Sequence, residues 1–149
     1  MTVLSIAIIV FILFESLNVL MLYFKPGSRM GNGIGVFNAY EKSKSDPEIH
    51  ALVSYMINWV AGTKLIFIAL LIVIVITGTS TTRILAVVAM ILSIASYYWR
   101  LHPAIKKMDE AGWITPKGYS KILGFMIMGF MIIFAAALIV SLVITAGRG

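Results

Sequence analysis

The chain has 149 residues, of which 60% are hydrophobic and only 12% are charged, and it carries a net charge of +6. Soluble domains are typically about 45–50% apolar and about 25% charged, so the composition excludes an ordinary soluble domain and indicates a membrane protein. Because the sequence contains no cysteine, disulfide frameworks, thiolate metal sites and cysteine nucleophiles are also excluded.

Four segments are long and apolar enough to cross the hydrocarbon core of a bilayer, which takes about 20 residues. They cover approximately residues 3–24, 55–77, 82–98 and 119–146. Because lipid offers no partners to free backbone N–H and C=O groups, each span is expected to be a helix. The sequence therefore predicts an all-α polytopic membrane protein. Residues 1–149 are expected to form a single four-helix transmembrane bundle with short interfacial helices in its two long loops.

The first span is interpreted as a retained helix rather than as a cleaved signal peptide. No Lys or Arg precedes it, and Glu15 interrupts its apolar run. It ends in Tyr23-Phe24-Lys25-Pro26, which is an aromatic and basic boundary without a small-residue cleavage pattern.

The first connection, residues 25–54, is expected to be irregular in its first half and helical in its second. The glycines between residues 27 and 35 disfavour a regular helix. Val36, Phe37 and Tyr40 would then share one side of a short interfacial turn, with the charged residues that follow facing water.

The start of the second helix is signalled by Asp46 and Pro47, a capping residue followed by proline at the first helical position. This helix is expected to begin outside the membrane and to enter it near Asn58. Residues 78–81 form a tight hairpin, so the second and third helices are expected to be antiparallel neighbours.

The third connection, residues 99–121, is again long and basic. Residues 103–111 can make two turns of interfacial helix, which would begin at a proline. In this helix Ile105 and Met108 are expected to face lipid, and Asp109 is expected to face water.

Basic residues gather in these two long connections. They hold nine of the 11 lysines and arginines found in loops, tails or helix ends. The positive-inside rule then predicts both long loops in the cytoplasm and both termini outside, in an integral membrane protein of a prokaryotic plasma membrane. Anionic lipids of the bilayer, and not nucleic acid, are the expected partner of this charge. The residues expected to contact lipid headgroups are Lys25, Arg29, Arg100, Lys106 and Lys107.

Two charged residues, Glu15 and Lys64, lie inside the apolar spans. A charge at this depth costs about 2.5–3.5 kcal/mol on insertion scales, so each of the two residues is expected to have either a function or a partner that offsets this cost. They lie within roughly one helical turn of the same depth on antiparallel helices, and we expect them to pair. Asn18 lies one turn from Glu15, and Asn58 would extend the polar path toward the cytoplasm. The set is either an intramembrane site for a proton or cation, or a structural bridge within or between protomers.

Two helix faces are suited to packing. Small residues recur along the third helix at Ala86, Ala89, Ser93 and Ser96. This stripe predicts close approach of another helix. The fourth helix carries Phe125, Met126, Met128, Phe130, Met131 and Phe134. These residues are expected to form a flexible apolar surface against lipid or a partner helix.

His50 and His102 are the remaining candidates for a metal or acid–base site at the interface. No His-Glu-x-x-His spacing is present, so no metal, cofactor or catalytic residue is predicted. Three functions remain. The first is an oligomeric channel or transporter for a small ion or solute that uses the Glu15–Lys64 pair. The second is an accessory or scaffold subunit of a larger membrane complex, and the third is an interfacial enzyme acting on a lipophilic substrate.

Overall fold

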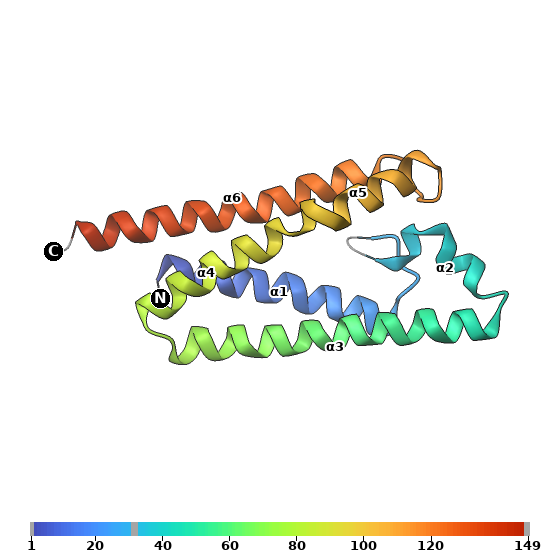
Figure 1. Ribbon diagram of the computed structural model, residues 1–149. Helices are drawn as coiled ribbons and strands as arrows, with labels where there is room; N and C mark the ends of the chain where they lie inside the picture. The colour runs from blue at the N-terminus through green and yellow to red at the C-terminus, as the bar shows by residue number, and fades with distance from the viewer. Residues whose placement is uncertain (1, 31–32, 148–149) are drawn as a thin grey trace.

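The fold is all-helical, with no strand among residues 2–30 and 33–147, the part of the chain that the computed structural model describes. The elements are α1 (Val3–Phe24), the 3-10 turn η1 (Ile34–Val36), α2 (Asn38–Ser43), α3 (Pro47–Thr77), α4 (Ser80–Ala95), α5 (Tyr97–Glu110) and α6 (Tyr119–Ala146) (Figure 1). Four helical stretches in this part are long and apolar enough to cross a membrane: α1, α3, α4 continued by α5, and α6. The predicted all-α class and the predicted apolar spans are confirmed.

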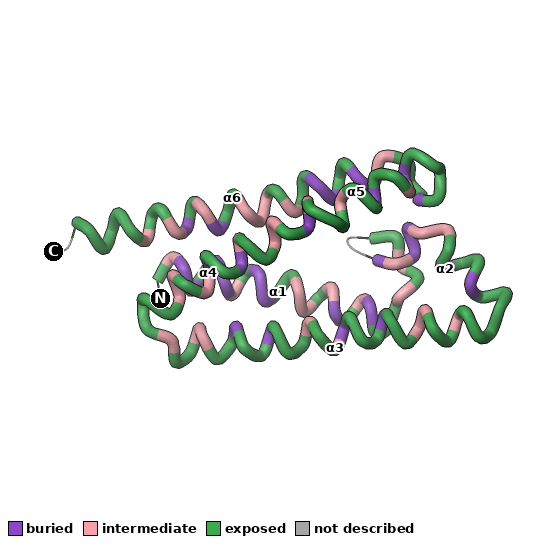
Figure 2. Tube along the Cα trace, viewed as in Figure 1, coloured by how far each residue is buried: buried purple, intermediate pink, exposed green. Residues whose placement is uncertain are grey.

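Helix α1 lies at the centre of the arrangement and packs against α3 on one side and α6 on the other (Figure 1). Helix α4 contacts all three of these helices. Buried side chains line the inner faces, whereas the outer faces are exposed (Figure 2). Both termini and the α3–α4 hairpin lie at one end of the molecule, and the two long connections lie together at the other end (Figure 1).

Aromatic rings join α1, α3 and α6. The ring centroid of Phe11 lies 6.1 Å from that of Phe67, 5.5 Å from that of Phe130 and 5.3 Å from that of Phe134. Such edge-to-face pairs contribute roughly 0.5–1.5 kcal/mol each beyond the burial of their area. Phe134 is only 1% exposed and packs against Phe11 of α1, so of the two predicted surroundings, lipid or a partner helix, it has the second. Phe125, at 78% exposed, does face outward.

The outer surface of the long helices is apolar. Ile76 of α3 is 73% exposed, and Val143 of α6 is 65% exposed. An apolar surface that runs along whole helices is unfavourable in water, and in a monomeric soluble protein it would be much smaller. Lipid chains accommodate such a surface, in agreement with the spans predicted from the sequence.

Helix α3 begins at Pro47, as predicted. The Asp46 carboxylate accepts hydrogen bonds from the backbone N–H groups of Glu48 at 3.0 Å and Ile49 at 3.2 Å, which satisfies two of the free donors of the first turn. The helix has 31 residues and is therefore about 46 Å long. It exceeds the hydrocarbon thickness of about 30 Å, so part of it projects beyond the apolar core.

The first connection packs inward instead of lying on the membrane surface. Val36 is completely buried, and Tyr40 is 8% exposed. The prediction of an interfacial turn is therefore wrong for these two residues, because both fill space inside the protein. The irregular stretch is found where predicted, and a Cβ atom on Gly35 would lie 1.9 Å from the carbonyl oxygen of Gly27. Gly31 and Asn32 of that stretch lie outside the described residues.

Helix α5 starts earlier than predicted and faces differently. It begins at Tyr97, separated from α4 only by Ser96, and it continues through Pro103. A proline inside a helix is unfavourable, but burial of Tyr97 and Ile105 in one cluster offsets this cost. Ile105 is 4% exposed and Asp109 is 5% exposed. The predictions that they face lipid and water, respectively, are therefore wrong.

The two long connections are joined to each other by backbone hydrogen bonds. The N–H of Asn38 donates to the carbonyl of Trp113 at 2.9 Å, and the N–H of Thr115 donates to the carbonyl of Val36 at 2.8 Å. These bonds fix the segment between α5 and α6 against the first connection. The start of α6 is thereby held in place.

The small-residue stripe of α4 does not mediate packing within the chain. Ala89, Ser93 and Ser96 are exposed, whereas the buried residues of α4 are Val87 and Met90. The prediction that the stripe packs closely is therefore wrong within one protomer. Larger side chains face α1 and α6 because they fill the space between helices without leaving voids.

Candidate functional site

Glu15 of α1 and Lys64 of α3 form an ion pair, in which the Lys64 ammonium donates to Oε2 of Glu15. The two side chains are 21% and 24% exposed, respectively. The predicted pairing is confirmed, and it joins two helices of one chain. An ionised side chain in hydrocarbon is costly on its own, so each partner makes the presence of the other tolerable.

Glu15 also borders a cavity of about 460 Å³ between α1 and α6. Its other polar neighbour is Asn18, one helical turn further along α1. The remaining lining is apolar and includes Phe14, Met21, Met30, Met126 and Phe130. The cavity therefore combines a mainly apolar wall with two polar groups on one side.

Asn18 carries an unused hydrogen-bond acceptor. Its Oδ1 atom is buried, and no described residue donates a hydrogen bond to it. Buried polar atoms nearly always have a partner. Asn18 is therefore the second polar residue, beside Glu15, at which the wall of this cavity departs from an apolar lining.

Asn58 lies apart from these groups. It is exposed on α3 and is not among the residues that line the cavity. The structure therefore brings together Glu15, Lys64 and Asn18 of the predicted polar set, but not Asn58.

The residues expected to contact headgroups occupy different surroundings. Lys25, Arg29 and Lys107 are exposed. The Arg100 guanidinium lies 5.3 Å from the ring centroid of Trp99, within the range of a cation–π contact. Lys106 borders a pocket together with other basic side chains.

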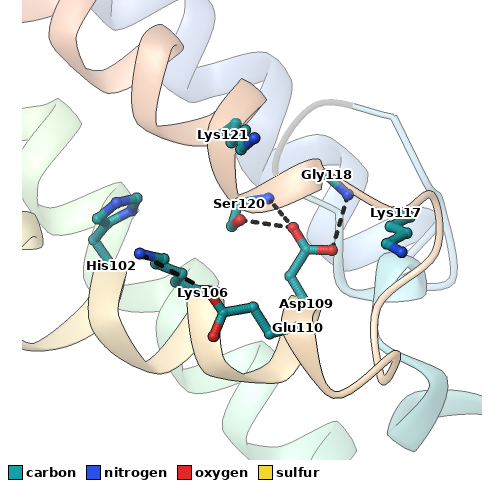
Figure 3. A pocket seen from close by; sticks show the side chains of 8 residues that line it. All are labelled: His102, Lys106, Asp109, Glu110, Lys117, Gly118, Ser120 and Lys121. Atoms are coloured by element: carbon teal, nitrogen blue, oxygen red, sulfur yellow. Dashed lines mark hydrogen bonds and ion pairs between the residues drawn. The ribbon is translucent and has the colours of Figure 1, made fainter.

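This second pocket has a volume of about 400 Å³ and lies where α5 meets the start of α6 (Figure 3). Its ionisable lining residues are His102, Lys106, Asp109, Glu110, Lys117 and Lys121. Sequence reasoning did not assign Lys117 and Lys121 to a site. Their spacing of four residues at a helix start was the only sequence feature that could have indicated a shared site. That α5 lies beside them follows from the tertiary structure alone.

Asp109 lines this pocket, which we call the basic pocket, and its carboxylate binds the start of α6. Its carboxylate accepts hydrogen bonds from the N–H of Gly118 at 2.9 Å, the N–H of Ser120 at 2.9 Å and the Ser120 hydroxyl at 2.6 Å (Figure 3). It thus replaces an N-cap side chain, since Gly118 at the start of α6 has none. Asp109 lies beyond the apolar part of α4 and α5. These hydrogen bonds, the one from the Ser120 hydroxyl most of all, hold the pKa of Asp109 below its ordinary value.

The two histidines have separate neighbours. Nδ1 of His50 lies 3.0 Å from the Ser43 hydroxyl, and the His102 ring packs against Tyr98 with 5.5 Å between ring centroids. Within residues 2–30 and 33–147 no three His, Asp or Glu side chains gather closely enough to hold a metal.

Comparison with protein-family models, curated proteins and solved structures finds no match for this chain.

Proposed function

We propose that the chain is an oligomeric membrane channel or transporter for a small ion or solute, with the Glu15–Lys64 pair as its polar site. The observation that carries this proposal is the double role of Glu15. It pairs with Lys64, and it also borders the cavity between α1 and α6. A structural bridge needs no access from outside, whereas a transport site must be reached by the molecule it moves.

The cavity favours a solute with an apolar body and one cationic or hydrogen-bond-donating group. Its polar side carries two residues, Glu15 with its carboxylate and Asn18 with its amide. A cation that approaches Glu15 competes with the Lys64 ammonium for the same oxygen atoms. Protonation of Glu15 removes the charge that both cations need. Binding and protonation should therefore oppose each other.

Transport in reconstituted vesicles tests the proposal. Purified protein is tested with K⁺ as a bare ion and with ethidium as a lipophilic organic cation, over a range of pH. We expect a flux that depends on pH, and we expect Glu15→Gln to remove this pH dependence, because glutamine can neither ionise nor exchange a proton. Glu41→Gln is the matched control, since Glu41 is an exposed carboxylate of the first connection.

Absence of flux for every tested ion and solute would contradict the transport function. It would also be contradicted if Glu15→Gln lowered only the stability of the protein and left flux and its pH dependence unchanged. A measurement of oligomeric state in mild detergent tests the oligomer separately.

We further propose that the two long connections face the cytoplasm and that both termini lie outside, in a prokaryotic plasma membrane. The excess of basic residues in these connections supports this orientation. Since the chain has no cysteine, single cysteines report the topology. In intact cells Ala111→Cys should be shielded from an impermeant thiol reagent, and Ser80→Cys should react. The opposite pattern would reverse the orientation.

The second candidate function is that of an accessory subunit in a larger membrane complex. The last ten described residues of the chain, 138–147, include none that is buried, and the C-terminal part of α6 extends beyond the other helices (Figure 1). This helix end is free to contact another membrane protein. Its removal by truncation after Ala137 should abolish co-purification of a partner from native membranes while preserving the Glu15–Lys64 pair. Unchanged co-purification would reject this surface.

A further inference from the structure

The basic pocket continues into a second cavity along α6. This cavity has a volume of about 280 Å³ and shares His102 and Lys121 with the basic pocket. Its other lining residues include Gly124, Phe125 and Met128 of α6. A polar pocket and an apolar groove therefore meet at the same two side chains.

The two cavities follow the direction of α6 into its apolar part. Lys121 lies in the first turn of α6, and Met128 lies seven residues further on, which corresponds to about 10 Å along the helix. Gly124 has no side chain at the centre of this path, and a Cβ atom there would lie 3.3 Å from Cε1 of His102. The Tyr98 hydroxyl donates to the carbonyl of Gly124 at 2.6 Å, which holds α5 against α6.

The charges of the basic pocket leave one positive charge unmatched. Three lysines, Lys106, Lys117 and Lys121, line the pocket together with two carboxylates, those of Asp109 and Glu110. The Asp109 carboxylate is buried and fully used as a cap of α6. Oε1 of Glu110 lies 3.8 Å from Nζ of Lys106, and the two side chains are 68% and 62% exposed, respectively.

We infer that this groove binds one anionic phospholipid. Its phosphodiester group lies among Lys106, Lys117 and Lys121, and one acyl chain follows Gly124, Phe125 and Met128 along α6. Charge complementarity carries the headgroup assignment, since one phosphodiester neutralises the unmatched positive charge. The apolar groove that begins at Lys121 favours a lipid over a soluble phosphate as the ligand. The site is separate from Glu15 and does not depend on transport.

Native mass spectrometry of the purified full chain in detergent measures this binding. The probes are phosphatidylglycerol, phosphatidylcholine and glycerophosphoglycerol, which is the phosphodiester headgroup of phosphatidylglycerol without acyl chains. We expect one molecule of phosphatidylglycerol to bind saturably and at least about tenfold more tightly than phosphatidylcholine. Equal affinity for glycerophosphoglycerol would overturn the lipid assignment, and equal affinity for phosphatidylcholine would overturn the charge assignment.

Two matched sets of variants locate the site. The first set compares two double variants. One is Lys106→Gln with Lys121→Gln, and the other is Lys42→Gln with Lys44→Gln, which removes the same number of charges from exposed residues elsewhere. We expect the first combination to weaken phosphatidylglycerol binding about tenfold or more and the second to change it less than about twofold. An equal loss in both would show general charge attraction and would overturn the site.

The second set tests the acyl groove without any change in charge. Met128→Trp fills the groove, whereas Ile133→Trp adds similar bulk on a different side of α6, at an outward position that is 53% exposed. Only Met128→Trp should weaken binding. If both variants bind phosphatidylglycerol like the unmodified chain, the acyl chain does not occupy this groove and the inference fails.

Discussion

Replacing Glu15 by Gln leaves the Lys64 ammonium inside an apolar segment without its partner, and replacing Lys64 by Met leaves the Glu15 carboxylate in the same position. Removing one member of a buried ion pair costs about 3–5 kcal/mol. Because the two side chains are 21% and 24% exposed, we expect values near the lower end, about 3 kcal/mol for each single variant. The double variant Glu15→Gln, Lys64→Met should recover much of this loss, because no unpaired charge remains.

A double-mutant cycle measures the interaction directly. Unfolding in mild detergent with increasing denaturant, followed by the fluorescence of the three tryptophans, gives the free energy of unfolding for the four proteins. With losses of about 3 kcal/mol in each single variant and a smaller loss in the double variant, a coupling energy of about 3 kcal/mol or more is expected, at the upper end of the range for residues in contact. Glu41 and Lys44 form the matched control pair, since their side chains are 53% and 48% exposed and exposed pairs contribute little. Additive losses at Glu15 and Lys64, with no coupling, would refute the pairing as a source of stability.

Two further predictions concern the junction of α5 and α6. Asp109→Asn should lower the free energy of unfolding by about 1–3 kcal/mol, because the hydrogen bonds from Ser120 lose their charged acceptor. The pKa of Asp109 is lower in the folded state, so its contribution is fully present above the unfolded pKa of about 3.9 and is lost as pH falls through the folded value. In a denaturation series between about pH 5 and pH 2 the unmodified chain should therefore lose more stability than Asp109→Asn. Gly124→Leu should destabilise the protein by roughly 1–3 kcal/mol, since even a Cβ atom there meets His102 at 3.3 Å. Gly129→Leu, where a Cβ atom meets nothing within 4 Å, should show no such loss in thermal unfolding; equal effects at both glycines would contradict the close packing of α5 on α6.

Local features of the sequence account for most of the helices. Apolar runs of sufficient length must be helical in lipid, so the positions of α1, α3, α4 and α6 follow from composition alone. Asp46 and Pro47 predicted the start of α3 because capping depends on neighbouring residues only. The pairing of Glu15 with Lys64 was also predictable, since the rise per residue gives the depth of each charge on antiparallel helices.

Packing between segments that are distant in the sequence could not be predicted from local sequence patterns. Asp109 reads as a water-facing residue of an interfacial helix, yet it is buried because the start of α6 supplies its three hydrogen-bond donors. Val36 and Ile105 read as lipid-facing residues, yet they fill one cluster because the two long connections join through backbone hydrogen bonds. Only the fold brings such partners together.

The candidate sites divide in the same way. The sequence determined that Glu15 and Lys64 are charges that a membrane does not tolerate singly, because the energetic cost depends only on residue type and depth. The tertiary structure decided that Glu15 and Asn18 border a cavity against α6, and that Lys117 and Lys121 join Lys106 in one pocket. The reason is that a site formed by two helices depends on their crossing, and the crossing depends on side-chain packing along the whole interface rather than on the local pattern of either helix.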